Sequence, residues 1–394
     1  MSEPAGRQAG TAAGIPPTVK GLSLVSLFND FASEMVYPLL PAFVVGTLGG
    51  SAATLGVLDG AADLTAAATK WVSGGLADRP RWRKPLIILG YFSAILVRPF
   101  IAAASAAWQV VSFRVIDRVG KGLRTPARDA FIADATPPAL RGRAFGFHRA
   151  ADHFGSIPGA LLAWWLLRES VDVRRVLTWS VVPGLLAGLV LLVVLLGAVI
   201  RPREPGEHVE DATGRVFWAP VLALAGMVLL RLPETLLLLR LQDLGVAVAT
   251  IPLVWAGLHV VRSFVSYPGG WLVDRMGPRG TVALGGVVFA GLGALLGLPL
   301  STTVAVGVFL ALGLVAGLTE SAERTLVSRL APKRTGRGFG AYHAVTGLAA
   351  LPAAAGFGLL YEHLGGGMAA KVSAAGMLAV TLLWLAVAPR QVTR

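Results

Sequence analysis

The chain has 394 residues, of which 55% are hydrophobic and only 14% are charged. Soluble domains carry roughly 25% charged residues, so this composition excludes an ordinary soluble protein. The net charge of +13 would fit a nucleic-acid partner, but excess Arg and Lys in a membrane protein collect in cytoplasmic loops, and we expect no nucleic-acid partner. The lack of cysteine excludes disulfides and thiolate metal sites.

Apolar segments recur along almost the whole chain, and many are long enough to cross a hydrocarbon core of about 30 Å. Residues 1–20 lack the apolar stretch of a signal peptide and are expected to form a cytoplasmic tail. We then expect a six-helix bundle over 21–200, with spans at 21–47, 52–76, 85–107, 108–128, 143–167 and 176–200. A polar cytoplasmic linker follows at 201–216. The second bundle is expected over 217–388, with spans at 217–241, 248–272, 280–299, 303–327, 337–362 and 368–388, before a tail at 389–394.

The predicted fold class is therefore an all-α membrane protein with twelve transmembrane helices in two pseudo-symmetric bundles. Basic residues concentrate in every second loop, for example 79–84, 141–143 and 329–337. The positive-inside rule then places both termini in the cytoplasm and the chain, as a multi-pass protein, in the cytoplasmic (inner) membrane. We expect a monomer.

Two segments of the first half recur in the second. The stretch GGLADRPRWRK after the second span matches GGWLVDRMGPR after the eighth. Likewise PPALRGRAFG before the fifth span matches APKRTGRGFG before the eleventh. Such a repeat predicts a transporter whose two halves move about a central site.

The first repeated loop resembles the signature loop of the major facilitator superfamily. Its pattern, a glycine four residues before an Asp-Arg pair, occurs as Gly74, Asp78 and Arg79, and again as Gly270, Asp274 and Arg275. The second copy fits the family pattern well, whereas Pro80, Arg81 and Trp82 depart from the usual spacing in the first.

Three further stretches carry the same resemblance over the rest of the first half. The fourth span contains Arg114, Gly120 and Gly122, which resemble the buried-arginine motif of the superfamily. In the fifth span, GSIPG at 155–159 loosely resembles the Gly-Pro motif of its antiporters. The string NDFASEMVYPLLP at 29–41 is similar to bacterial exporters, including drug-resistance and nickel-resistance branches.

The resemblance implies a secondary transporter that works by alternating access, with gates at the signature loops. An acid near the cytoplasmic end of the following helices ties down each loop in this family. On this basis we expect Asp129 or Asp134 to pair with Arg79, and Glu323 to pair with Arg275.

Charged side chains inside the expected spans fall on common helical faces, with the densest stripe in the fourth span. Each costs about 2.5–3.5 kcal/mol at the bilayer centre, so we expect them to face one another or a water-filled cavity. The candidates for proton coupling or the substrate cavity are Asp30, Glu34, Asp59, Asp63, Arg114, Asp117, Arg118, Lys121, Arg149, Asp152, His153, Arg231, Glu234, His259, Arg262 and Glu320.

The roles of these groups remain open between two interpretations. Asp30, Glu34, Asp63 and Asp152 are candidates to release a proton during transport, with His153 as a relay. Alternatively, the acids only neutralise Arg114, Arg118 and Arg149. His148 is expected to be a solvated or capping residue near the membrane edge.

We therefore expect proton-coupled export of a cationic or amphipathic small molecule or a metal cation, with protons and the lipid bilayer as the other partners. Alternatives are symport of an organic anion on the basic side chains, or flipping of a lipid. A sensor is disfavoured because both gate loops are present. We expect no enzyme, no cofactor and no resident metal, although the acids of the first two spans and His153 offer ligands for a divalent cation.

Overall fold

The computed structural model describes residues 14–40, 42–50, 52–197, 211–212, 214–247 and 250–389, and all regular elements within these ranges are helices. The first half comprises α1 (Pro17–Val36), the short 3₁₀ and π turns Tyr37–Leu39 and Ala42–Thr47, α2 (Ala52–Ala77), α3 (Pro80–Ala103), α4 (Ala107–Ala135), the 3₁₀ turn Pro138–Leu140, α5 (Arg141–Arg168), α6 (Val173–Trp179) and α7 (Val181–Gly197). The second half comprises α8 (Gly214–Leu230), α9 (Glu234–Asp243), α10 (Ile251–Leu296), α11 (Thr302–Leu330) and α12 (Thr335–Val387).

Each expected span overlaps helical residues in the expected order. The exact ends differ: α1 begins at Pro17 and α8 at Gly214, both earlier than expected. Most of the expected linker and of both expected tails lies outside the described residues.

Two long helices each contain a sharp break at a glycine. Gly277 in α10 and Gly365 in α12 have φ of 79° and 78°, a region that residues with a Cβ rarely adopt. Each of these helices therefore consists of two helical segments, and each covers two of the expected spans. At 231–233 the chain also breaks between α8 and α9, and the Ser373 hydroxyl donates to Leu230 O (2.8 Å) and accepts from Leu232 N (2.8 Å).

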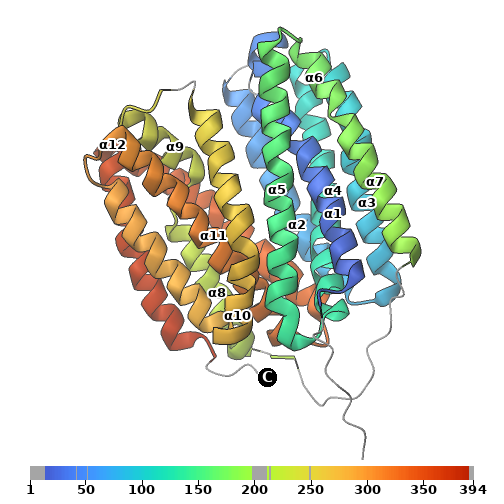
Figure 1. The fold of residues 1–394 in the computed structure, drawn as a ribbon, viewed down its shortest axis with the longest axis vertical. Helices are drawn as coiled ribbons and strands as arrows, with labels where there is room; N and C mark the ends of the chain where they lie inside the picture. Colours follow the sequence, from blue (N-terminus) through green and yellow to red (C-terminus); the bar gives the residue numbers. More distant parts are fainter. Residues whose placement is uncertain are drawn as a thin grey trace, which may run out of the picture.

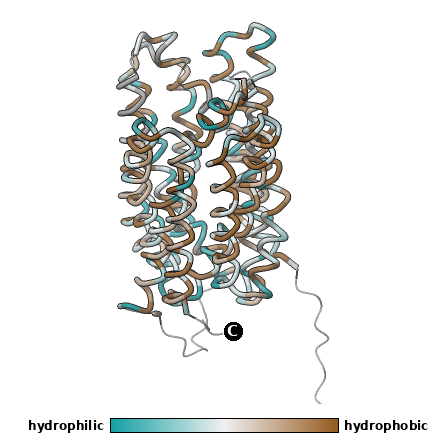
Figure 2. The backbone as a smooth tube through the Cα atoms, turned by 90° about the vertical axis from the view of Figure 1, so that its left-hand side faces the viewer, coloured by the Kyte–Doolittle hydropathy of each residue, from teal (hydrophilic) through white to brown (hydrophobic). Residues whose placement is uncertain are grey.

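Five helical stretches among the described residues are long and apolar enough to cross a membrane: Pro80–Ala103, Val173–Gly197, Leu253–Leu296, Thr302–Leu330 and Thr335–Val387. The helices α1, α2, α4 and α5 carry the charged stripes and do not meet this measure. Hydrophobic residues cover most of the helical length, with hydrophilic turns at both ends (Figure 2).

The two halves of the chain form two groups of helices that stand side by side (Figure 1). The halves contact through α2, α4 and α5 of the first and α10, α11 and α12 of the second. We call the end where α1 begins and α12 finishes the terminal end; the turns at 78–80 and 331–334 lie there too. A single buried apolar cluster joins the halves, including Ala77 and Phe145 from the first and Val273 and Phe339 from the second.

Candidate functional site

At the terminal end, the signature-loop aspartate of each half caps the first turn of a helix in the other half. Asp78, in the turn after α2, accepts from the backbone N–H of Arg337 in α12 (3.0 Å). Asp274, in α10, accepts from the backbone N–H groups of Gly142 (2.8 Å) and Arg143 (3.1 Å) at the start of α5, and from Arg143 Nε (3.0 Å). Because the N-terminus of a helix carries unpaired N–H donors and a partial positive charge, a carboxylate stabilises it. We call this pair of contacts the aspartate latch.

The latch lies where the two halves approach most closely. A Cβ on Gly74 would lie 2.6 Å from Gly336 O and 2.7 Å from Gly340 Cα, so the backbones of α2 and α12 are in direct contact. Phe145 and Phe339 occupy matching positions of the repeat, and their rings meet edge to face at 5.9 Å. Only residues without a side chain allow this approach, so the terminal end is sealed in this structure.

Asp78 is held in a partly desolvated turn. Burial raises the pKa of the Asp78 carboxyl above its ordinary value, and the backbone N–H groups of Arg337 and Gly336 oppose that rise. Acid therefore neutralises this half of the latch at a higher pH than it would neutralise a solvated aspartate.

In this conformation the gate arginines are not paired with their expected partners among the described residues, and pairing in another state of the gate stays a prediction. Asp134 pairs with Arg83 of its own half at 2.5 Å, and no ion pair involves Arg79 among the described residues. In the second half, the Glu323 carboxylate accepts from the Tyr342 hydroxyl, and Arg275 stacks over the Trp271 ring at 3.9 Å.

Asp129 lies at the centre of a buried charge cluster shared by the two halves. This fully buried carboxylate is 3.0 Å from Arg128 Nη2 in its own helix. Across the interface it lies 2.9 Å from His343 Nε2 in α12 and 3.5 Å from Arg324 Nε in α11. Asp129 thus lies in the contact between the halves, with Arg128, His343 and Arg324 as its partners.

A second polar cluster crosses between the halves through α5 and α11. Arg149 binds Asp152 one turn away at 2.8 Å and reaches across to Glu320 of α11, also at 2.8 Å. His153 Nε2 lies 3.6 Å from the other oxygen of Glu320. His148 Nε2 is 3.7 Å from Asp152 Oδ1, so the polar contacts continue into the first half. We call these five residues the bridging cluster.

The bridging cluster continues into α10. The rings of His153 and His259 are 5.5 Å apart, and His259 packs edge to face on Trp255. Arg262 stacks over Trp255 at 5.8 Å and forms an ion pair with Glu234 of α9. A small cavity of about 60 Å³ lies beside this pair, lined by residues that include Arg231, Glu234, Arg262 and Glu320. A polar cavity of this size can hold water, which would extend the polar connection.

The acids of α1 do not neutralise the arginines directly. Asp30 accepts from the Asn29 amide at 3.0 Å, and neither Asp30 nor Glu34 forms an ion pair among the described residues. Arg114 and Arg118 bind Asp117 instead, at 3.0 Å and 3.5 Å.

Asp30 and Glu34 nevertheless lie within electrostatic range of Lys121 of α4. Asp63 and Lys121 are exposed although both lie in the middle of their helices, and Glu34 is partly exposed. The Asp59 side chain lies outside the described part of the chain.

Sequence reasoning missed three buried residues. Arg98 of α3 donates to Asn29 O (3.2 Å), Asn29 Oδ1 (3.1 Å) and Ser33 Oγ (3.1 Å), and an isolated arginine in an apolar span could have indicated it. His343 has no comparable signal because its partner Asp129 is far away in the sequence. His148 was expected to be solvated, but its side chain is fully buried against Ser23 and Asp152.

No group of three or more His, Cys, Asp or Glu side chains is arranged to hold a metal ion in the part of the chain that the structure describes.

The model of the Major Facilitator Superfamily matches residues 22–241 and 235–394, which together cover nearly the whole chain. The chain belongs to this superfamily. It is thus a multi-pass membrane protein of a transporter family, as its sequence resemblance indicated.

Two curated proteins and one solved structure illustrate what the chain is similar to. An uncharacterised MFS-type transporter of Methanocaldococcus jannaschii is 25% identical over 357 residues, which are 86% of this chain and 87% of that protein. The multidrug resistance protein MdtH of Photorhabdus laumondii is 31% identical over 134 residues, only 34% of this chain and 33% of the relative. The crystal structure of the E. coli fucose:proton symporter superposes with a TM-score of 0.72 at 16% identity, covering 94% of this chain and 98% of the symporter. The last similarity concerns the fold alone.

Proposed function

We propose that this superfamily member is a proton-coupled secondary transporter that exports a small molecule by alternating access. It would cross the inner membrane twelve times, as a monomer with two six-helix bundles and both termini in the cytoplasm. In this assignment the breaks at Gly277 and Gly365 lie at turns between consecutive spans. The positive turns at 79–84 and 331–337 then face the cytoplasm, as the positive-inside rule requires.

Under this topology the structure is closed toward the cytoplasm. The aspartate latch, the glycine contacts and the Phe145–Phe339 pair all lie at the terminal end. A substrate path in this conformation would open toward the opposite face. Release of the latch would let the halves separate at the cytoplasmic end, which is the other state of an alternating-access cycle.

The bridging cluster is the observation that carries proton coupling. Glu320 lies at its centre and is held by Arg149 and His153 of the other half. Separation of the halves would remove these partners from the carboxylate. A carboxylate that loses cationic partners binds a proton more readily, so the conformational change and proton uptake are linked through Glu320. Asp152 binds Arg149 and His148 of its own helix, so it would keep both partners when the halves separate, while Arg149 would lose Glu320.

Export is supported by the partial similarity to a multidrug resistance protein and by the exporter-like string in α1. The partly exposed Asp30 and Glu34 and the exposed Asp63 would attract a cationic compound. A second candidate is proton symport of an organic anion. It is favoured by the exposed Lys121 beside Arg114 and Arg118, which would bind a carboxylate or phosphate. Flipping of a lipid is a third candidate.

The test is proton movement in proteoliposomes that contain a pH-sensitive dye. Metal cations, amphipathic cations and organic anions are supplied in turn to the parent protein, to Glu320→Gln and to Asp30→Asn. Glu362→Gln is the matched control because Glu362 is an exposed acid of α12 outside the cluster.

We expect one class of substrate to drive proton flux that Glu320→Gln abolishes while substrate binding, measured by calorimetry, persists. Full flux in Glu320→Gln would remove this residue from the coupling mechanism. If none of the three classes moved protons through the parent protein, the proposal of proton coupling would be wrong.

A further inference from the structure

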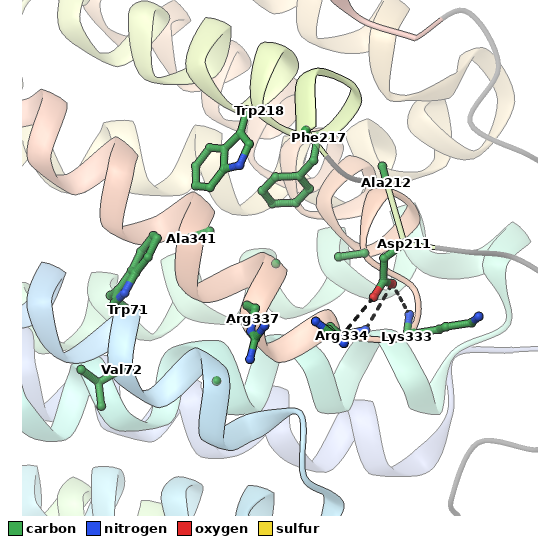
Figure 3. A pocket seen from close by; sticks show the side chains of 14 residues that line it. Trp71, Val72, Asp211, Ala212, Phe217, Trp218, Lys333, Arg334, Arg337 and Ala341 are labelled. Carbon is green, nitrogen blue, oxygen red and sulfur yellow. Dashed lines mark hydrogen bonds and ion pairs between the residues drawn. The ribbon is translucent and has the colours of Figure 1, made fainter.

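A large pocket opens at the terminal end between the two halves, away from the bridging cluster. Its volume is about 890 Å³, and it lies between α2 of the first half and α8 and α12 of the second (Figure 3). The segment 211–212 and the turn 331–334 complete its wall. We call it the α2–α8–α12 pocket. It shares Arg337 with the latch, but none of the bridging-cluster residues lines it.

The polar side of the pocket is basic. Its charged lining residues are Lys333, Arg334, Arg337 and Asp211. Asp211 is already engaged, because its carboxylate accepts from the backbone N–H groups of Lys333 (2.6 Å) and Arg334 (3.3 Å) and lies 4.0 Å from Arg334 Nε. Arg337 Nε also lies 3.9 Å from Asp78 of the latch. The side chains of Arg334 and Arg337 are each 62% exposed, and Lys333 is exposed and forms no ion pair among the described residues. These cations are available to an anion.

The other side of the pocket is aromatic and apolar. Trp71 of α2 and Trp218 of α8 stack at 6.5 Å with an interplanar angle of 25°, and Phe217 packs edge to face on Trp218 at 5.2 Å. Trp71 and Val72 are 54% and 64% exposed, whereas Trp218 is partly exposed and Phe217 is buried, so the α2 side of this wall faces outward from the protein.

The basic residues of the pocket lie at the terminal end of the molecule, and its aromatic residues lie farther along the helices. The basic residues lie in the turn at 331–334 and the first turn of α12. Trp71 lies six residues before the end of α2, and Trp218 lies four residues after the start of α8. At 1.5 Å per residue, both residues lie about 6–9 Å along their helices from the helix ends that form the terminal end. A phospholipid has the matching order, with its anionic phosphate at the membrane surface and its acyl chains deeper in the membrane. Tryptophan is also enriched at this depth of a bilayer.

We propose that the α2–α8–α12 pocket binds an anionic phospholipid. The headgroup phosphate lies against Lys333, Arg334 and Arg337, and an acyl chain covers the Trp71–Trp218 pair. A soluble anion would use the basic residues but would leave the outward-facing aromatic wall uncovered. Because α2 belongs to one half and α8 and α12 to the other, a bound lipid contacts both halves beside the latch. It thereby stabilises the sealed terminal end.

The experiment uses the tryptophan pair as its reporter. The full chain is placed in phosphatidylcholine nanodiscs that contain a minor fraction of either brominated phosphatidylglycerol or brominated phosphatidylcholine, since bromine quenches tryptophan on contact. The same measurement is made on the variant with both Lys333→Gln and Arg334→Gln, and on the variant with both Trp71→Phe and Trp218→Phe. Arg81→Gln is the control, because Arg81 is exposed at the same end but does not line the pocket.

We expect brominated phosphatidylglycerol to quench more than brominated phosphatidylcholine in the parent protein and in Arg81→Gln. The tryptophan variant should lose this difference. Neutralising Lys333 and Arg334 should weaken the apparent preference about fivefold for each charge, because each basic residue near an anionic surface contributes about 1 kcal/mol. Equal quenching by the two lipids overturns the proposal, as does a preference that survives in the lysine–arginine variant. If millimolar inorganic phosphate abolished the preference, the pocket would be a site for soluble anions and the lipid assignment would be wrong.

Discussion

Replacement of Asp274 by asparagine should open the terminal end. The carboxylate accepts three N–H groups from the start of α5. Asparagine keeps one acceptor oxygen for Gly142 but presents an NH₂ group to the two donors of Arg143. Hydrogen bonds to a charged group contribute about 1.5–3 kcal/mol when buried, and Arg143 is partly exposed, so we take about 2–3 kcal/mol for the two together. All of this stabilisation belongs to the sealed state, because donors and acceptor lie on opposite halves.

Such a loss shifts the equilibrium toward the open state by about 30- to 150-fold. The chain has no cysteine, so a single introduced thiol reports the opening without background. Ser266→Cys is a suitable reporter because Ser266 is only 2% exposed, and a Cβ on Gly146 of the other half would meet its carbonyl oxygen. We expect Asp274→Asn to raise the rate at which a water-soluble maleimide labels this thiol by a similar factor, until the open state predominates.

Asp134→Asn is the matched control for this measurement. It removes the same charge at the same end, but Asp134 pairs with Arg83 of its own half. It should leave the labelling rate unchanged. An unchanged rate in Asp274→Asn would refute the latch, and equal acceleration in both variants would show general loosening instead.

Three further variants test the glycine contact beside the latch, the buried charge cluster at Asp129 and the break between α8 and α9. Gly74→Ala should accelerate labelling of the same thiol, because overpacking costs about 1–3 kcal/mol, whereas Gly75→Ala should not, since nothing lies within 4 Å of its added methyl group. Asp129→Asn should lower the midpoint of thermal unfolding more than Asp134→Asn, because breaking a buried ion cluster costs about 3–5 kcal/mol; equal midpoints would contradict this account. Ser373→Ala should cost about 1–3 kcal/mol in the same assay, because it leaves backbone groups between α8 and α9 without their partner, and an unchanged midpoint would mean that water replaces the hydroxyl.

The order of the helices and the equivalence of the two signature loops could be predicted from sequence because both leave local or repeated signals. An apolar stretch must satisfy its backbone hydrogen bonds internally, so it predicts a helix directly. The repeat matched Asp78 with Asp274 and Gly142 with Gly336, and the structure uses these positions in the two copies of the latch. Glycine at both contacts follows from the close approach of the backbones.

The partners of the buried charges could not be predicted because they depend on how the halves are placed. His343 lies against Asp129, and Arg149 against Glu320, and each of these pairs joins residues of opposite halves. The family pattern pointed to acids that bind Arg79 and Arg275, and it gave no sign that backbone N–H groups at two helix termini would bind Asp78 and Asp274. Every helix has unpaired backbone N–H donors at its N-terminus, so residue type does not reveal which of them bind an aspartate.

The latch occurs in both halves of the chain, whereas the buried charges that could bind protons are concentrated in the first half and around Glu320. The latch is repeated in both halves, and its two copies use the same residue types and the same helix termini. The buried charges are not repeated: α4 and α5 carry several, whereas the matching helices of the second half place few beside Glu320. Mechanical closure needs both copies, since each aspartate joins one pair of helices. Proton binding needs only one carboxylate whose partners leave when the halves part. Loss of one latch copy should therefore alter conformational equilibrium while keeping coupling, and loss of Glu320 should abolish coupling while keeping closure.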